Sequence, residues 1–169
     1  MTSVLKVDEI QNVSSGTTGL TIDAAGVVDL AQTPRFSVYH TTNSQLSYSN
    51  DDHFVTNSTI GHRITMVGFS FNDGVYTANV TGDYYTSFHG IKNSSGSVEW
   101  TLQQISGSSS GTKLTAFVND DASLWHPFGF AGVIPFVAGD TFKLCIPQAS
   151  ATYEGHGGAY MTFAMYKIG

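Results

Sequence analysis

The most constraining feature of the chain is a strand–turn–strand pattern near its middle, in Gly74–His89, which reads GVYTANVTGDYYTSFH. Alternating side chains predict a strand over Val75–Ala78, because successive residues of a strand point to opposite faces of a sheet. Gly82 permits the chain to reverse direction. The segment that follows, Gly82–Lys92, is rich in Tyr and Phe, which favour strands. The middle of the chain therefore predicts antiparallel β-structure.

A similar pattern continues along most of the chain. Short alternating stretches are separated by clusters of Gly, Asn, Asp and Ser, and no segment keeps apolar residues at helical spacing. The 169 residues suffice for one sizeable all-β domain and a short appendage. We expect Arg35–His40 to be the first strand of the domain and Arg63–Phe71 to form one strand. The polar region Thr41–Ile60 is expected to be a loop with one or two short strands.

The N-terminal part of the chain has a different character. Short strands are predicted at Ser3–Ile10, Leu20–Ile22 and Val27–Leu30, with Gly-containing turns between them. These strands hold too few apolar residues to bury a core alone, although three copies wound about one axis would share one. This segment therefore reads as a stalk or an anchor.

A proline marks the end of this segment. Pro34 restrains the residue before it and cannot donate a hydrogen bond to a sheet. We therefore predict an anchoring segment over residues 1–33 and a globular domain over residues 34–169. The candidate anchoring residues are the apolar side chains of the first predicted strand: Val4, Leu5, Val7 and Ile10.

The globular part resembles the heads of complement subcomponent q and of tumour-necrosis-factor-like proteins. The central match is Gly74–His89, and Pro34–Val38 is similar to the opening strand of those families. Val137–Leu144, with a turn at Gly139 and Asp140, and the closing Thr162–Tyr166 follow in the order that the families show. The resemblance implies a jelly-roll β-sandwich that assembles as a homotrimer, and proteins of that shape display and bind rather than catalyse.

The N-terminal segment resembles a different group of proteins. Leu5–Ile10 (LKVDEI) and Gly16–Gly26 (GTTGLTIDAAG) are similar to an N-terminal segment that recurs in structural proteins of marine tailed bacteriophages. This resemblance implies attachment to other virion proteins through residues 1–33.

Apolar residues occupy both faces of two predicted strands. In Tyr84–His89 the aromatic side chains fall on both parities, and the closing strand Ala159–Tyr166 is apolar on both faces. Two interpretations remain open: a thick sandwich core with aromatic residues at its edges, or a subunit interface around a threefold axis. The resemblance favours the second.

Composition excludes several classes of protein. The formal net charge of -6 and the lack of a Lys/Arg cluster argue against binding to a nucleic-acid backbone. No apolar run is long enough to span a membrane, and the charged N-terminus does not read as a signal peptide. Cys145 is the only cysteine, and its apolar neighbours predict a buried, inert thiol. We expect synthesis in a host cytoplasm, no membrane insertion and no nucleic-acid partner.

The sequence offers little for catalysis or cofactor binding. The histidines are not paired at metal-ligand spacing, and no Gly-x-Ser-x-Gly motif is present. Glu99 and Glu154 are among very few glutamates, so paired carboxylates for glycoside cleavage are not expected. The acidic clusters Asp51–His53 and Asn119–Asp121 would suit either calcium or hydrogen-bonded turns, and turns are the favoured interpretation. We therefore predict a protein that is not an enzyme and has no cofactor, with calcium as the minor alternative.

Two aromatic segments, expected in loops, are candidates for a ligand surface. They contain Trp125 with His126, and Tyr153 with His156. Exposed aromatic rings beside polar groups suit sugars, which stack on the ring while polar groups bind the hydroxyls. Packing against a neighbouring subunit is the alternative.

These features favour a structural protein on the surface of a tailed bacteriophage particle. We interpret the chain as a homotrimeric capsid decoration, head-fibre or short appendage protein. The alternative is a tail-fibre adhesin whose head binds host-surface glycan.

Overall fold

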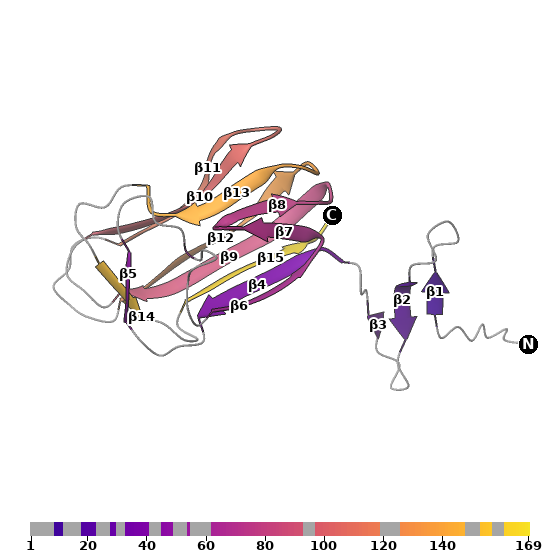
Figure 1. The fold of residues 1–169 in the computed structure, drawn as a ribbon, viewed down its shortest axis with the longest axis horizontal. Coiled ribbons are helices and arrows are strands. Elements are labelled where there is room, and N and C mark those ends of the chain that lie inside the picture. The colour runs from indigo at the N-terminus through magenta and orange to yellow at the C-terminus, as the bar shows by residue number, and fades with distance from the viewer. Residues whose placement is uncertain are drawn as a thin grey trace, which may run out of the picture. The chain divides into compact units, whose positions relative to one another are not determined.

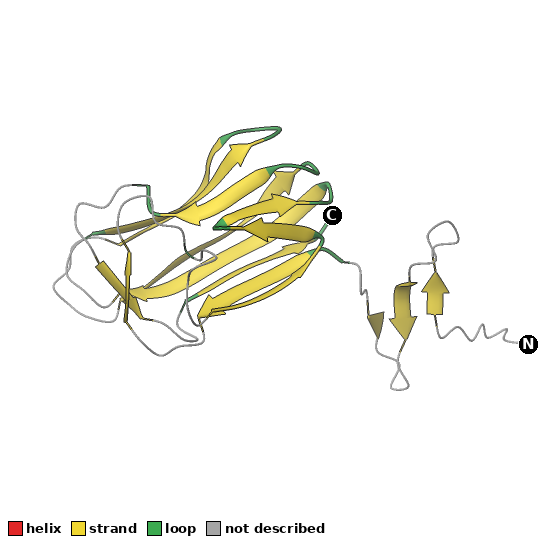
Figure 2. Ribbon diagram, viewed as in Figure 1, coloured by secondary structure: helices red, strands yellow, loops and turns green. Residues whose placement is uncertain are grey.

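The computed structural model describes residues 9–11, 18–22, 28–29, 33–40, 45–48, 54, 62–92, 97–118, 126–147, 153–156 and 161–169. The chain divides into two compact units, Met1–Thr33 and Pro34–Gly169. The described part of the chain contains strands joined by loops and no helix (Figure 2). Accordingly, it contains no helix with the length and apolar character to cross a membrane.

The N-terminal unit contains a small antiparallel sheet in the order β1-β2-β3. Its strands are β1 (Glu9–Gln11), β2 (Thr18–Ile22) and β3 (Val28–Asp29). Ile10 pairs with Leu20 across the first two strands, and Ile22 pairs with Val28 across the next two. The other candidate anchoring residues, Val4, Leu5 and Val7, lie outside the described residues.

The second unit contains two antiparallel sheets (Figure 1). The five-stranded sheet has the order β11-β10-β13-β8-β7, and the seven-stranded sheet has the order β5-β14-β9-β15-β4-β6, with β12 also paired to β9. The strands are β4 (Arg35–His40), β5 (Gln45–Tyr48), β6 (His62–Val67), β7 (Phe69–Asn72), β8 (Val75–Ala78), β9 (Gly82–Lys92), β10 (Val98–Ser106), β11 (Gly111–Val118), β12 (His126–Phe136), β13 (Thr141–Cys145), β14 (Tyr153–His156) and β15 (Thr162–Lys167). The expectation of an all-β sandwich is confirmed, and β4, β8 and β9 have the predicted bounds.

One expected strand is in fact two. Residues 63–71 were expected to form a single strand, but β6 and β7 belong to different sheets. Gly68 lies between them with a φ of 71°, a conformation that favours glycine. A Cβ atom there would also lie 2.8 Å from the Cβ of Pro34. The chain therefore changes sheets at Gly68, a step that strand periodicity alone does not reveal.

Aromatic rings fill the space between the sheets. Phe36 of β4 stacks on Tyr76 of β8 with ring centroids 5.0 Å apart, and Tyr76 stacks on Phe142 of β13 at 5.4 Å. Phe136 continues the stack at 4.8 Å from Phe142. Such contacts add about 0.5–1.5 kcal/mol each to the benefit of burying the rings. The stack joins strands of both sheets, so it fixes how the sheets face each other.

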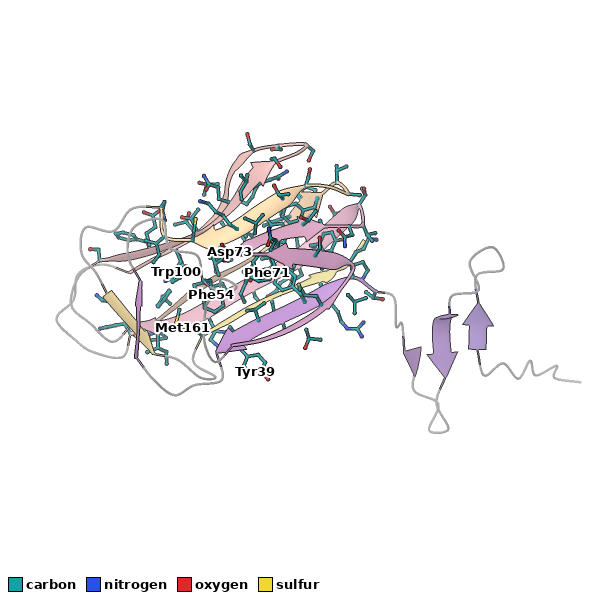
Figure 3. The ribbon with its side chains drawn as sticks, in the orientation of Figure 1. Tyr39, Phe54, Phe71, Asp73, Trp100 and Met161 are labelled. Carbon is teal, nitrogen blue, oxygen red and sulfur yellow. The ribbon has the colours of Figure 1, made fainter. Side chains whose placement is uncertain are left out.

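A residue outside the long strands completes the core. Phe54 is 1% exposed, and its backbone N–H donates to the carbonyl oxygen of Leu144 at 2.9 Å. Its ring lies 5.8 Å from that of Trp100 and 5.5 Å from that of Phe88 (Figure 3). Because the residues around Phe54 in the sequence are polar, the sequence did not predict that its side chain packs in the core. Cys145 is buried, as expected.

Candidate interaction surfaces

Residues of β9 alternate between the core and the outside. Tyr84, Thr86 and Phe88 are buried, whereas Tyr85 and Ser87 are half-buried and His89 is exposed. Side chains of a strand alternate between the two faces of its sheet. The outward-pointing residues of β12, β9, β15, β4 and β6 therefore share one surface, which we call the aromatic face.

A row of large side chains crosses the aromatic face. In register, Arg35 of β4 lies beside Tyr166 of β15, Tyr166 beside Tyr85 of β9, and Tyr85 beside Val133 of β12. The rings of Tyr85 and Tyr166 have centroids 5.2 Å apart. Tyr166 is 48% exposed and Val133 is 55% exposed. Large side chains thus remain open to solvent on the central strand β15 and on the edge strand β12, which pairs with β9.

The next row of the aromatic face is made of small residues. It runs through Thr65, Ser37, Ala164, Ser87 and Ala131. A hollow of about 510 Å³ lies at the β6 side of the face, lined by Arg35, Phe36, Ser37, Thr65, Met165 and Tyr166. The aromatic face is therefore not flat. We call this row of small residues the trough, and aromatic rings lie in the rows beside it.

A third row bounds the trough on its other side. It contains Tyr39 of β4, Thr162 of β15, His89 of β9 and Gly129 of β12. Figure 3 shows Tyr39 pointing away from the sandwich. The outward positions of β12 are all apolar: Pro127, Gly129, Ala131, Val133 and Pro135.

The outward surface of the five-stranded sheet, which we call the polar face, is different. Across it, Ser70, Thr77 and Thr141 are neighbours in register, and Gln103 lies beside Lys143. Hydroxyl, amide and ammonium groups of this kind bind water readily. Apolar side chains also occur on these strands: Phe117 of β11 is 58% exposed and pairs with Glu99, Ile105 of β10 is 43% exposed, and the half-buried Val75 of β8 pairs with Lys143.

Hairpin turns meet at one end of the sandwich around a buried carboxylate. Asp140 accepts hydrogen bonds from the backbone N–H and the hydroxyl of Ser108, both at 2.7 Å, and from the backbone N–H of Val137 at 2.9 Å. Gly107, at a φ of 111°, brings its backbone so close that a Cβ would overlap the carboxylate. Asp140 therefore ties the β10–β11 turn to the β12–β13 turn.

The charge of Asp140 follows from these bonds. Burial by itself raises the pKa of the Asp140 carboxyl. Hydrogen bonds from Ser108, Val137 and the Gln104 side chain together lower the pKa by more than burial raises it, so the net pKa lies below the ordinary value. The sequence indicated only a turn residue at this position.

Two tyrosines of the core are also perturbed. Burial raises the pKa of Tyr76 well above its ordinary value, and it also raises the pKa of Tyr84. The Tyr84 hydroxyl donates to the carbonyl oxygen of Val80 at 2.6 Å. Both groups remain neutral over the physiological range and serve packing.

The segments proposed as a ligand surface converge at one end of β9. His126 begins β12 directly opposite Lys92, and Gly155 of β14 also pairs with Lys92. Residues about thirty positions apart in the sequence are thus brought together, with Tyr153 and His156 at the two ends of β14. The expectation of loops is wrong here, because β14 pairs with β5 along its length. Trp125 lies outside the described residues.

Calcium binding was the minor alternative for two acidic segments of the sequence. Asp51–His53 and Asn119–Asp121 both lie outside the described residues. Within the described part of the chain, no group of three or more His, Cys, Asp or Glu side chains is placed to hold a metal ion.

Comparison with known proteins identifies the fold. No protein-family model matches the chain, and no curated protein does. Among solved structures, Eiger TNF from S. frugiperda superposes with a TM-score of 0.67 at 11% identity, over 82% of this chain and 94% of that one. Murine APRIL superposes with a TM-score of 0.59 at 10% identity, over 80% of this chain and 99% of that one.

A complement protein gives the same result. The globular domain of zebrafish complement 1qA superposes with a TM-score of 0.55 at 20% identity, over 80% of this chain and 98% of that one. The fold is a TNF-like and C1q-like jelly roll. This confirms the fold that the motifs in Gly74–His89 and Val137–Leu144 predicted, and at these identities the likeness concerns the fold alone.

Proposed function

We propose that this chain is a non-enzymatic structural protein displayed on the surface of a bacteriophage particle, where the jelly-roll heads form a homotrimer. It would be made in the host cytoplasm and would serve as a capsid decoration, a head fibre or a short appendage. The observation that carries the assembly part is the aromatic face, with Tyr166 exposed on the central strand β15 and Val133 exposed on the edge strand β12.

The dimensions and chemistry of the aromatic face favour burial against other copies. Strands lie about 4.8 Å apart, so the strands β12, β9, β15, β4 and β6 of the aromatic face span roughly 20–25 Å. Its rings rim a trough of small residues, and aromatic residues are enriched in interface cores whereas Lys and Glu are depleted there. The TNF-like and C1q-like resemblance supports a threefold arrangement of the copies.

The N-terminal unit is proposed to attach the trimer to other virion proteins. Its strands β1, β2 and β3 are only three, five and two residues long, too short to bury a core of their own. Val4, Leu5, Val7 and Ile10 are the proposed contacts. The resemblance of Leu5–Ile10 and Gly16–Gly26 to phage segments supports this part of the proposal.

Sedimentation equilibrium of the full chain tests the assembly. The chain has a mass of 18.1 kDa, and we expect a species of three times that mass at micromolar concentration and neutral pH. A well-folded monomer under these conditions would contradict the proposal.

Antibody labelling of purified particles tests the location. Gold label on the shell would support a capsid decoration or head fibre, and label at the tail would support an appendage used in attachment. Particles that lack the chain altogether would remove the virion role while leaving the trimer untouched.

A second candidate function is adhesion to host-surface glycan through the head. The observation in its favour is that the two ends of β9 lie near different features of the head. The chain enters the head at Pro34, whose carbonyl oxygen accepts from Lys167, near the Gly82 end of β9. His126 and Gly155 meet at Lys92, the opposite end of the same strand. A ligand surface there would lie at the opposite end of β9 from the residue where the chain enters the head.

Glycan-array binding by the intact trimer tests this second function. We expect Trp125→Ala and Tyr153→Ala each to weaken binding at least tenfold without changing the sedimenting mass. Thr77→Ala, on the polar face, is the matched control and should bind as the wild type does. No binding by the wild type to any glycan would exclude adhesion to sugars and leave the structural role in place.

A further inference from the structure

His89 occupies a central position on the aromatic face. It lies on β9 and is flanked in register by Thr162 of β15 and Gly129 of β12. Both neighbours are small, and His89 itself is exposed. Its imidazole therefore stands above the surface that the proposed trimer would cover.

Among the described residues, no acid shares the row of His89 to balance a proton. On the elements that flank β9, the row neighbours Thr162 and Gly129 carry no charge. Tyr39 of β4 continues the row, and Arg63 of β6 holds the register position beyond it. Arg35, also on the aromatic face, adds positive charge, not negative charge.

Two described carboxylate residues of this sheet lie on other rows than His89. Glu154 of β14 adjoins Gly155, which pairs with Lys92, three residues after His89. Asp83 lies on β9 six residues before His89, and strand residues advance about 3.3 Å each, so the two are separated by about 20 Å. Asp83 also pairs in register with Pro135, at the Phe136 end of β12. Within the described part of the chain, a charge on His89 would therefore have no carboxylate of its own copy in the same row or in the Ser87 row beside it.

We propose that His89 makes assembly through the aromatic face sensitive to acid, with the trimer weakening as pH falls from neutral towards 5. Histidine is the side chain that ordinarily gains its charge between pH 5 and 8. Covering a charge without a partner is costly, so a charged imidazole favours separated copies. This inference rests on the proposed trimer and adds a regulation of its interface.

The size of the effect follows from the number of copies. If only the neutral imidazole is covered, each protonated copy weakens association by the same factor. A trimer covers three copies of His89, so its association constant falls as the third power of that factor.

Sedimentation of the full chain at the two pH values tests the inference. We expect the wild type to be trimeric at pH 7.5 and to dissociate markedly at pH 5.5, and His89→Asn to remain trimeric at both. Thermal unfolding monitored by circular dichroism confirms that each variant is folded at each pH.

A matched variant locates the effect. In the His89→Asn background, Thr77→His places a histidine on the polar face, and we expect it to restore no dependence on pH. Dissociation of His89→Asn at pH 5.5, or recovery of the pH dependence by Thr77→His, would overturn the inference.

The remaining outcomes separate this inference from the proposed function. A wild type that is trimeric and equally stable at both pH values, or more stable in acid, would overturn the histidine inference alone. A folded wild type that is monomeric at both pH values would overturn the proposed trimer and the inference with it.

Discussion

The two outward faces of the head contain the same kind of strand but opposite chemistry. On the aromatic face, Tyr85 and Tyr166 lie in contact beside Val133. On the polar face, the corresponding central positions hold Thr77, Thr141 and other hydrophilic residues. The buried sides of both sheets are equally apolar, so the shared core does not explain the difference.

The difference shows which surface the chain leaves for a partner. A large exposed apolar patch on the outward face of a sheet marks an interaction surface, because a soluble protein gains nothing by keeping it in water. A face rich in Thr and Gln does not carry the free-energy cost of exposing apolar groups to water. We therefore expect substitutions on the aromatic face to change assembly, and matched substitutions on the polar face to be silent.

The largest effect is expected from a charge placed in the trough. Ala164→Arg puts a guanidinium on the central strand β15, where Arg35 is the nearest described charge in the adjoining row. An unpaired charge buried at an interface costs about 3–5 kcal/mol per copy, so assembly should be lost. The matched control is Thr77→Arg on the polar face, which is similarly half-buried on β8. Sedimentation velocity distinguishes them, and equal behaviour of the two variants would break the comparison.

A substitution in the core should lower the stability of the whole head, because the core lies between the sheets that carry the two outward faces. Phe142 is fully buried and stacks on both Tyr76 and Phe136. We expect Phe142→Ala to lower the free energy of unfolding by about 3–5 kcal/mol, because a cavity replaces the ring. Urea denaturation at fixed protein concentration measures this loss. A loss below 1 kcal/mol would mean that the aromatic stack does not hold the sheets together.

A smaller effect is expected at the carboxylate that ties the turns. Asp140→Asn replaces one acceptor oxygen by a donor facing the N–H groups of Ser108 and Val137. We expect a loss of about 1–3 kcal/mol at pH 7 by chemical denaturation, with assembly retained.

The pH dependence of this variant gives a second measurement. Because the pKa of Asp140 is lowered in the folded state, its contribution to stability is present above the ordinary carboxyl range, near pH 4, and is lost as pH falls through the folded value. The stability gap between wild type and Asp140→Asn should therefore narrow below pH 4. A gap that stays constant down to pH 2 would show that Asp140 acts without its charge.

The smallest effect is expected at the centre of the polar face. Lys143 lies on β13 beside Gln103 and Val75, and no interface is proposed there. We expect Lys143→Ala to change stability by less than about 0.5 kcal/mol and to leave the sedimenting mass unchanged. A loss of assembly in this variant would mean that the polar face also takes part in contacts between copies.

Local sequence was enough to predict the all-β class and several of the strands. Alternation and turn residues gave β4, β8 and β9 their bounds, since a strand's period of two and the backbone freedom of glycine are local properties. The resemblance of the motifs between Gly74 and Leu144 to known families predicted the jelly roll. Aromatics on both parities of β9 predicted two occupied faces, but not which neighbours each ring would have.

Only the tertiary structure decided the surfaces and the ties between distant residues. Register aligned Tyr166, Tyr85 and Val133 in one row and brought His126 and Gly155 to either side of Lys92. It also placed Asp140 against Ser108, 32 residues away in sequence. These relations depend on which strands become neighbours, and pairing is settled by burial and hydrogen bonding over the whole domain, because no local segment carries that information.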